Sequence, residues 1–144
     1  SPSNPYMRPL SESILIFSKS SHKLEGNKEH SDITADEFKE WTKNAWFIPN
    51  EHNKNHPCVF PKEMVRRLIK LYTYKGNTVL DPFLGTGTTT VVARDLKRDS
   101  IGFEINQKYC DIANKRLEQE NIQYFMGGME SDSRKTNQSN KRRY

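Results

Sequence analysis

The apolar residues of this chain gather in short runs that long polar stretches separate. Residues 13–17 form one such run, Ser-Ile-Leu-Ile-Phe, which predicts a buried strand. The polar stretch over residues 18–32 predicts a loop. Thr34 then stands where an N-cap precedes a helix over residues 35–41, and Glu37 holds the capping-box position.

After residue 60 the apolar positions recur at the three- and four-residue steps of an amphipathic helix. Pro61 opens this helix, and the apolar stripe consists of Met64, Val65, Leu68, Ile69 and Tyr72. The basic residues between them are expected to face away from the stripe: Lys62, Arg66, Arg67 and Lys70. The pattern then predicts a turn at 75–77, a strand at 78–81, a loop at 82–87, a helix from 88 to about 96 and a strand at 100–104. Asn106 can cap a last helix, whose stripe is Tyr109, Ile112, Ala113 and Leu117.

Composition narrows the class of protein without choosing a function. The chain has 144 residues, is 33% hydrophobic, and has a formal net charge of +5. Two cysteines, Cys58 and Cys110, do not support a disulfide scaffold and fit a reducing compartment. No apolar run approaches the ~20 residues of a membrane helix. We therefore expect a cytoplasmic protein without a membrane partner, whose basic charge is compatible with nucleic acid but does not require it.

The segment over residues 78–105 has the length of a βαβ crossover, which places its two strands parallel in one sheet and predicts an α/β fold. Gly85 and Gly87 allow the loop to turn sharply and leave its backbone open to a ligand. Glu104 ends the second strand beside that loop, where a carboxylate can accept hydrogen bonds from both hydroxyls of a ribose. The pattern is typical of a site that binds an adenosine cofactor.

The charge at the end of the first strand indicates which adenosine cofactor is bound. Asp81 would repel a pyrophosphate but suits the ammonium group of a methionine moiety. Thr90 replaces the third glycine of the dinucleotide fingerprint, and no lysine follows Gly87 as it does in a phosphate-binding loop. We therefore favour S-adenosylmethionine over NAD or ATP, with a fragment of an NAD-dependent oxidoreductase as a disfavoured alternative.

Three segments carry a resemblance to a known family. Residues 81–89, Asp-Pro-Phe-Leu-Gly-Thr-Gly-Thr-Thr, closely resemble motif I of the DNA amino-methyltransferases, which modify exocyclic nitrogens of adenine or cytosine. Residues 101–105, Ile-Gly-Phe-Glu-Ile, are similar to motif II, and residues 56–61, His-Pro-Cys-Val-Phe-Pro, to motif X. Residues 8–12 are similar to motif VIII, which borders the target-base pocket. Motif X before motif I is the permuted order of the beta class.

The resemblance implies a Rossmann-like methyltransferase fold, represented by the cofactor-binding half of its sheet. Residues 1–49 would be a motif VIII-like strand and a short variable region, residues 50–126 the S-adenosylmethionine-binding βαβ region, and residues 127–144 a disordered basic tail. The implied cofactor-binding residues are His56, Phe60, Asp81, Pro82, Phe83, Leu84, Gly85, Thr86, Gly87, Thr88, Glu104 and Ile105.

The family also has a catalytic loop of the type (Asp, Asn or Ser)-Pro-Pro-(Tyr or Phe), whose aromatic ring stacks on the flipped base. This chain contains no Pro-Pro pair, and we interpret Asn4-Pro5-Tyr6 as a coincidence. We therefore assign no catalytic residue and expect the chain to be inactive and poorly stable without a complementary chain or segment that carries this loop. The expected substrate is double-stranded DNA, within a restriction-modification system.

Several alternatives stay open from the sequence. The short interval before motif X and the Trp46–Pro49 stretch favour cytosine-N4 methylation, while adenine-N6 methylation and a non-catalytic cofactor-binding subunit remain alternatives. Phe83 either contacts the ligand, which we favour, or fills the junction of sheet and helix. Trp41, Trp46 and Phe47 are expected to form a buried cluster rather than to stack on bases. Packing is favoured over a nucleophilic role for Cys58, and we expect no metal site at His52, His56 and Cys58.

Overall fold

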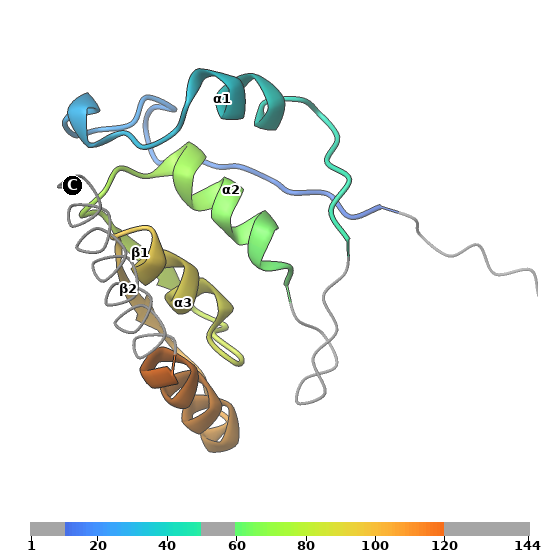
Figure 1. Cartoon of the computed structure of the whole chain (residues 1–144), viewed down its shortest axis with the longest axis vertical. Helices are drawn as coiled ribbons and strands as arrows, with labels where there is room; N and C mark the ends of the chain where they lie inside the picture. Colours follow the sequence, from blue (N-terminus) through green and yellow to red (C-terminus); the bar gives the residue numbers. More distant parts are fainter. Residues whose placement is uncertain (1–10, 50–59, 120–144) are drawn as a thin grey trace, which may run out of the picture.

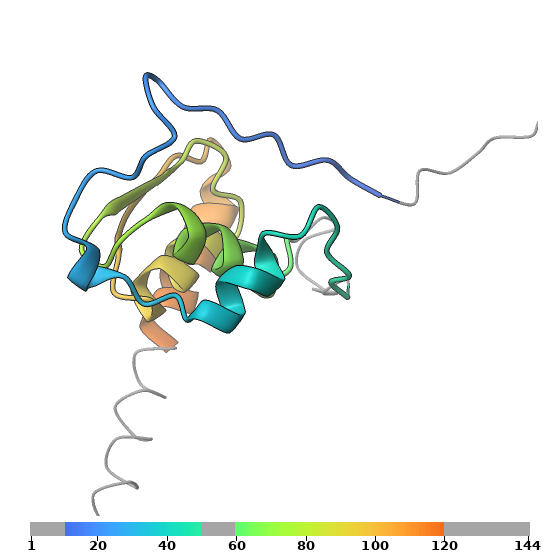
Figure 2. The same cartoon turned by 90° about the horizontal axis from the view of Figure 1, so that it is seen from above.

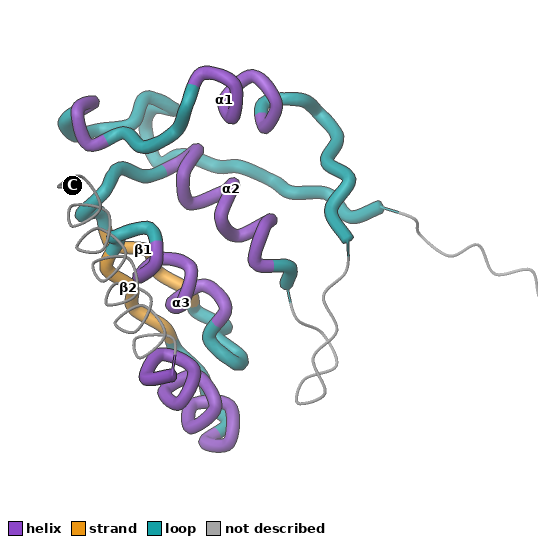
Figure 3. The backbone as a smooth tube through the Cα atoms, in the orientation of Figure 1, coloured by secondary structure: helices purple, strands orange, loops and turns teal. Residues whose placement is uncertain are grey.

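The computed structural model describes residues 11–49 and 60–119 (Figure 1). Its elements are, in order, the 3₁₀ helix η1 (Lys28–His30), α1 (Ala35–Trp41), α2 (Lys62–Tyr72), β1 (Thr78–Asp81), α3 (Thr88–Asp95) and β2 (Asp99–Gly102). A further helix, here called the 107–119 helix, begins after Asn106 and extends to the end of the described range. Figure 3 shows how these helices alternate with the two strands and with long loops.

The two strands form the predicted parallel βαβ unit. β1 pairs with β2 in parallel, with Leu80 opposite Ile101 and Asp81 opposite Gly102. α3 connects them and packs together with α2 on one face of the pair (Figures 1 and 2). The core on that face consists of Val65, Ile69, Val92 and Ala93, with Val79 and Leu96 packed against them. The α/β fold expected from the periodicity is therefore confirmed, although β2 ends at Gly102 and not at Glu104.

The N-terminal half contributes a short helix that packs on α2. Thr34 caps α1 as predicted: its hydroxyl accepts from the Glu37 amide, and the Glu37 carboxylate accepts from the Thr34 amide. Trp41 at the end of α1 is buried, and the Arg66 guanidinium lies 4.7 Å from its ring centroid. Lys70 lies 5.4 Å from the same ring and also donates to Glu37.

Three of the basic side chains of α2 that were predicted to face away from its apolar stripe pack against α1. Arg66, Arg67 and Lys70 lie within cation–π range of Trp41. Their charged groups lie over the indole ring and also bind the carboxylates of Glu37 and Glu63. A basic stripe can therefore form an interface between two helices, because the tryptophan and the acidic residues both supply partners for its charged groups.

A second contact holds the polar loop over residues 18–32 against the core. Arg98 follows α3, its side chain is fully buried, and its Nη1 and Nη2 donate to the two Asp32 carboxylate oxygens over 2.6 and 2.8 Å. Nη2 also donates to the Thr73 carbonyl oxygen, and Nη1 to that of Leu96. Every polar end of this buried arginine therefore faces an acceptor, which offsets the cost of burying its charge.

Two predictions for the N-terminal half are wrong. Residues 13–17 form no strand, and Phe17 is 85% exposed. A strand needs a neighbour for its backbone hydrogen bonds, and none of the elements described pairs with this run. In the expected aromatic cluster, Trp41 is buried and its carbonyl accepts from the Trp46 indole over 2.9 Å, but Phe47 is exposed.

Several sequence predictions lie outside the described residues. These concern most of the motif VIII-like segment at 8–12, the Asn4-Pro5-Tyr6 tripeptide, most of the motif X-like segment including His56 and Cys58, and the basic tail at 127–144.

Candidate functional site

The site is built around the loop that leaves the carboxyl end of β1. Within this loop, the Phe83 amide donates to the Asp81 carboxylate over 3.0 Å, and the Gly87 amide donates to the Leu84 carbonyl over 3.0 Å. Two backbone bonds tie it to the residue after β2: the Phe103 amide donates to Asp81, and the Leu84 amide donates to the Phe103 carbonyl, each over 2.9 Å. The loop therefore lies beside the carboxyl end of both strands, where ligands bind in open parallel sheets.

Two glycines give the loop its shape. Gly85 and Gly87 have φ values of 53° and 82°, in the left-handed region that glycine adopts at low cost. Gly87 meets a second requirement, since a Cβ there would lie 2.8 Å from the Ala113 Cβ of the 107–119 helix. The glycine thus allows the start of α3 to rest directly on that helix.

Glu104 joins the loop to the start of the next helix. One of its carboxylate oxygens accepts from the Gly85 amide over 2.9 Å, and the other accepts from the Asn106 amide over 2.8 Å. The sequence predicted the proximity of Glu104 to the glycine loop, and the structure brings the two together. A carboxylate has about four acceptor positions, so each oxygen of Glu104 retains capacity for a hydroxyl donor.

The side chains of the loop divide into exposed and inward-facing groups. Phe83 is 88% exposed, so it does not fill the junction of sheet and helix. Leu84 does so instead, because a Cβ on Gly102 would lie 2.7 Å from its Cδ1. Pro82, Ile105 and Phe60 are also exposed, and Asp81 is half-buried.

Two contacts at the site were not anticipated from the sequence. Asn106 is linked to Glu104, and Arg116 donates from its Nη1 to the Thr86 carbonyl over 2.6 Å. The buried hydroxyls of Thr86 and Thr88 lie 3.2 and 3.4 Å from the same nitrogen. Arg116 stands three residues after Ala113, on the inward stripe of the helix, and a charged residue at such a position indicates a specific internal partner.

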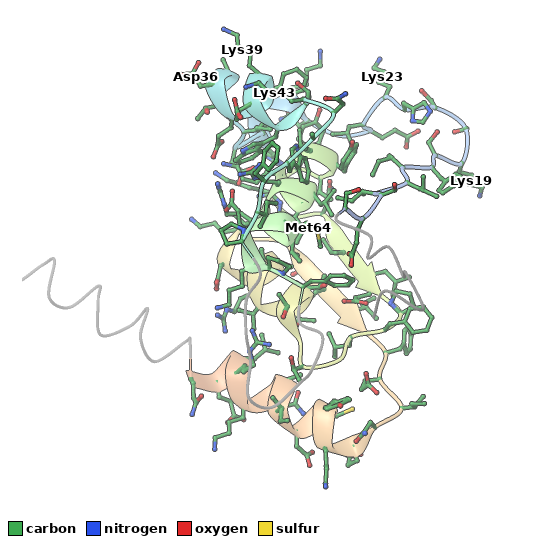
Figure 4. All side chains as sticks on the ribbon, turned by 90° about the vertical axis from the view of Figure 1, so that its right-hand side faces the viewer. Lys19, Lys23, Asp36, Lys39, Lys43 and Met64 are labelled. Carbon is green, nitrogen blue, oxygen red and sulfur yellow. The ribbon has the colours of Figure 1, made fainter. Side chains whose placement is uncertain are left out.

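The charged surface at the other end of the molecule is mixed. Figure 4 shows Lys19 and Lys23 on the loop before α1, Asp36 and Lys39 on α1, and Lys43 just after it. Lys43 is paired with Glu40. Acidic side chains are interspersed with the basic ones, so this end does not by itself define a nucleic-acid interface.

Over residues 11–49 and 60–119, no cluster of three or more histidine, cysteine, aspartate or glutamate side chains is arranged to hold a metal ion. None of the helices in the same ranges is long and apolar enough to cross a membrane.

A parallel strand–glycine loop–helix–strand unit, with a carboxylate just after its second strand, defines the chain as part of a Rossmann-like fold. The chain belongs to the DNA methylase family of N6 and N4 amino-methyltransferases, whose profile matches residues 1–115.

Individual relatives support this assignment. The chain is 38% identical to the type II methyltransferase M.MjaI of Methanocaldococcus jannaschii in an alignment of 126 residues, which covers 81% of this chain and 41% of that protein. It is 40% identical to the type II methyltransferase M.BglI of Bacillus subtilis in an alignment of 92 residues, which covers 62% of this chain and 26% of that protein. The structure is similar to that of TTHA0409 from Thermus thermophilus in complex with S-adenosyl-L-methionine, with a TM-score of 0.61 and 27% identity. That comparison covers 77% of this chain and 49% of TTHA0409, so the chain spans about half the length of these relatives or less.

Proposed function

We propose that this chain is the S-adenosylmethionine-binding portion of a DNA methyltransferase. The observation that carries the proposal is the hydrogen bond from the Gly85 amide to Glu104, which places a carboxylate against a glycine loop at the carboxyl end of two parallel strands. TTHA0409, whose structure is similar, is solved with S-adenosyl-L-methionine. When bound, this cofactor supplies a methyl group on a positively charged sulfur.

We assign the parts of the cofactor to residues by their chemistry. Glu104 would accept hydrogen bonds from the ribose hydroxyls, and Asp81 would bind the ammonium group of the methionine moiety. The backbone of residues 85–88 would approach the ligand closely, since the Thr86 and Thr88 side chains are turned inward. The proposed set also includes three exposed apolar side chains, Phe60, Phe83 and Ile105. Pro82, Leu84 and His56 complete it.

Calorimetric titration of the full chain with S-adenosylmethionine tests this proposal. We expect saturable binding, with NAD inert, and an Asp81→Ala variant whose Kd is raised about tenfold or more because one charged hydrogen-bond partner is lost. Asp99→Ala is the matched control, since Asp99 is exposed at the opposite end of the same pair of strands. Equal weakening by both variants, or no binding by a folded wild-type chain, would contradict the proposed site.

For the whole enzyme we propose methyl transfer to an exocyclic amino nitrogen of a base in double-stranded DNA. The order of the motif X-like and motif I-like segments supports the permuted beta class. The short interval before motif X and the Trp46–Pro49 stretch favour cytosine-N4 as the target, with adenine-N6 as the alternative. Nucleoside analysis of DNA methylated by the completed enzyme distinguishes them, because N4-methylcytosine and N6-methyladenine differ in mass.

We also propose that a complementary segment carrying a Pro-Pro loop completes the enzyme. α2 and α3 leave one face of the two strands uncovered. On this face Leu80 is 60% exposed and Ile101 is 52% exposed, and the apolar run at 13–17 is exposed as well. Exposed apolar strand faces of this kind favour association. The relatives are about twice as long as this chain or more, and their additional sequence could cover this exposed face.

This part of the proposal predicts cofactor binding without catalysis by the chain alone. Incubation with methyl-labelled S-adenosylmethionine and unmethylated duplex DNA should transfer no label, whereas the same chain joined or mixed with the complementary segment should transfer it. Label transfer by the isolated chain would refute the need for that segment. Failure of the combined protein, with both parts folded and cofactor bound, would favour the alternative of a non-catalytic cofactor-binding subunit.

A further inference from the structure

Arg116 makes a contact with the glycine loop that differs from the other contacts of its helix. Its Nη1 donates to the Thr86 carbonyl over 2.6 Å, and this carbonyl belongs to the peptide that joins Thr86 to Gly87. Gly87 gives the backbone after that peptide more conformational freedom than another residue would. A bond from a charged donor is stronger than one from a neutral donor, so this contact restrains the loop next to a glycine.

The helix itself does not need Arg116 to stay in place. Ala113 is buried against the start of α3, and the Arg94 Nη1 donates to the Leu117 carbonyl over 2.6 Å. In the part of the chain that the structure describes, none of the ion pairs involves Arg116, and its hydrogen bonds all go to Thr86 and Thr88. The side chain is therefore dedicated to the loop and not to a general charge network.

We infer that Arg116 is a positioning residue for the cofactor loop. It holds the peptide between Thr86 and Gly87, while Glu104 holds the Gly85 amide. The two contacts together fix the loop in one conformation before any ligand binds, which lowers the ordering cost of binding. This inference rests on the proposed cofactor site, since it names a residue that shapes that site.

Amide hydrogen exchange of the full chain measured by NMR tests the inference without a ligand. In an Arg116→Met variant, which keeps most of the apolar stem, we expect the Leu84, Gly85 and Gly87 amides to exchange about tenfold faster or more. The amides of α3 should exchange as in the wild type. Titration with S-adenosylmethionine should show a Kd raised by a similar factor, and Arg116→Lys should recover much of both effects because it keeps a charged donor.

Arg94→Met is the matched control. Arg94 lies on α3 and donates to Leu117 of the 107–119 helix, so its removal takes away a contact of that helix that does not involve the loop. We expect it to leave loop exchange and the Kd unchanged. Unchanged loop exchange in Arg116→Met, or equal effects of Arg94→Met and Arg116→Met, would overturn the positioning role. If the wild-type chain binds no S-adenosylmethionine, the proposed function fails, and the exchange measurement by itself decides the role of Arg116.

Discussion

Two glycines with nearly the same positive φ allow the packing of the proposed cofactor loop to be measured. Gly76, in the turn before β1, has φ of 81°, and Gly87, at the start of α3, has φ of 82°. A Cβ at Gly76 would meet no atom within 4 Å, whereas one at Gly87 would lie 2.8 Å from the Ala113 Cβ and 3.1 Å from the Thr90 hydroxyl. Alanine at either position therefore meets the strain of a positive φ, but only at Gly87 does its Cβ also collide with neighbouring atoms.

The expected costs follow from these two terms. A left-handed conformation costs a non-glycine residue about 1–2 kcal/mol, so Gly76→Ala should lower the free energy of unfolding by about that amount. Optimal carbon–carbon contact lies at about 3.5–4.0 Å, so the Gly87 variant must separate α3 from the 107–119 helix. Overpacking of this kind adds about 1–3 kcal/mol, which brings the expected cost of Gly87→Ala to about 2–5 kcal/mol.

Urea unfolding followed by the fluorescence of Trp41 and Trp46 measures both costs in the same chain. Gly76→Ala should bind S-adenosylmethionine as the wild type does, while Gly87→Ala should bind it more weakly, because the displaced helix carries Arg116. Adding Ala113→Gly to Gly87→Ala removes the nearest colliding atom and should recover part of the lost affinity. Equal destabilisation by the two alanine variants would show that the loop does not rest on the 107–119 helix as described.

Three further predictions concern the contacts of the N-terminal half. Arg98→Met removes the buried partner of Asp32 and should cost about 3–5 kcal/mol in urea unfolding, with a much smaller cost when Asp32→Asn is already present. Thr34→Ala removes the cap of α1 and should cost about 1 kcal/mol, measured in the same way. Burial alone would raise the pKa of Glu37, but hydrogen bonds from Lys70 and the Thr34 amide outweigh it and lower the pKa to about 2. The stability that Glu37 contributes is therefore present above pH 4.5 and is lost as the pH falls toward 2, and a Glu37→Gln variant should lack this part of the acid transition.

The elements that the sequence predicted correctly are those determined by neighbours in the chain. The cap of α1 needs only Thr34 and the residue three positions later, and both of its hydrogen bonds are present. The turn before β1 needs a glycine with positive φ, which Gly76 supplies. The strand–loop–helix–strand order over 78–102 follows from short apolar runs and the glycine loop, and its parallel pairing follows from the connection through α3.

The features that the sequence did not predict depend on residues far apart in the chain. Arg98 and Asp32 are separated by 66 positions, and nothing in the pattern around either residue identifies the other as its partner. The run at 13–17 has the composition of a buried strand, but burial needs a surface to pack against, and composition does not supply one. The partner of the basic side chains of α2 was not predicted for a related reason, since Trp41 lies on another helix.

The same distinction explains how the candidate site works. Motif-like residues at 81–88 define a loop, yet the contacts that hold this loop come from Glu104, 19 positions after Gly85, and from Arg116, 30 positions after Thr86. A glycine-rich loop alone would sample many conformations, and a ligand would have to order it on binding. Because a carboxylate and a guanidinium each restrain the loop, the smallest unit with a preformed version of the proposed cofactor loop extends from β1 through Arg116 and not only to the end of β2. The residues after the second strand therefore belong to the proposed cofactor site as fully as the glycines do.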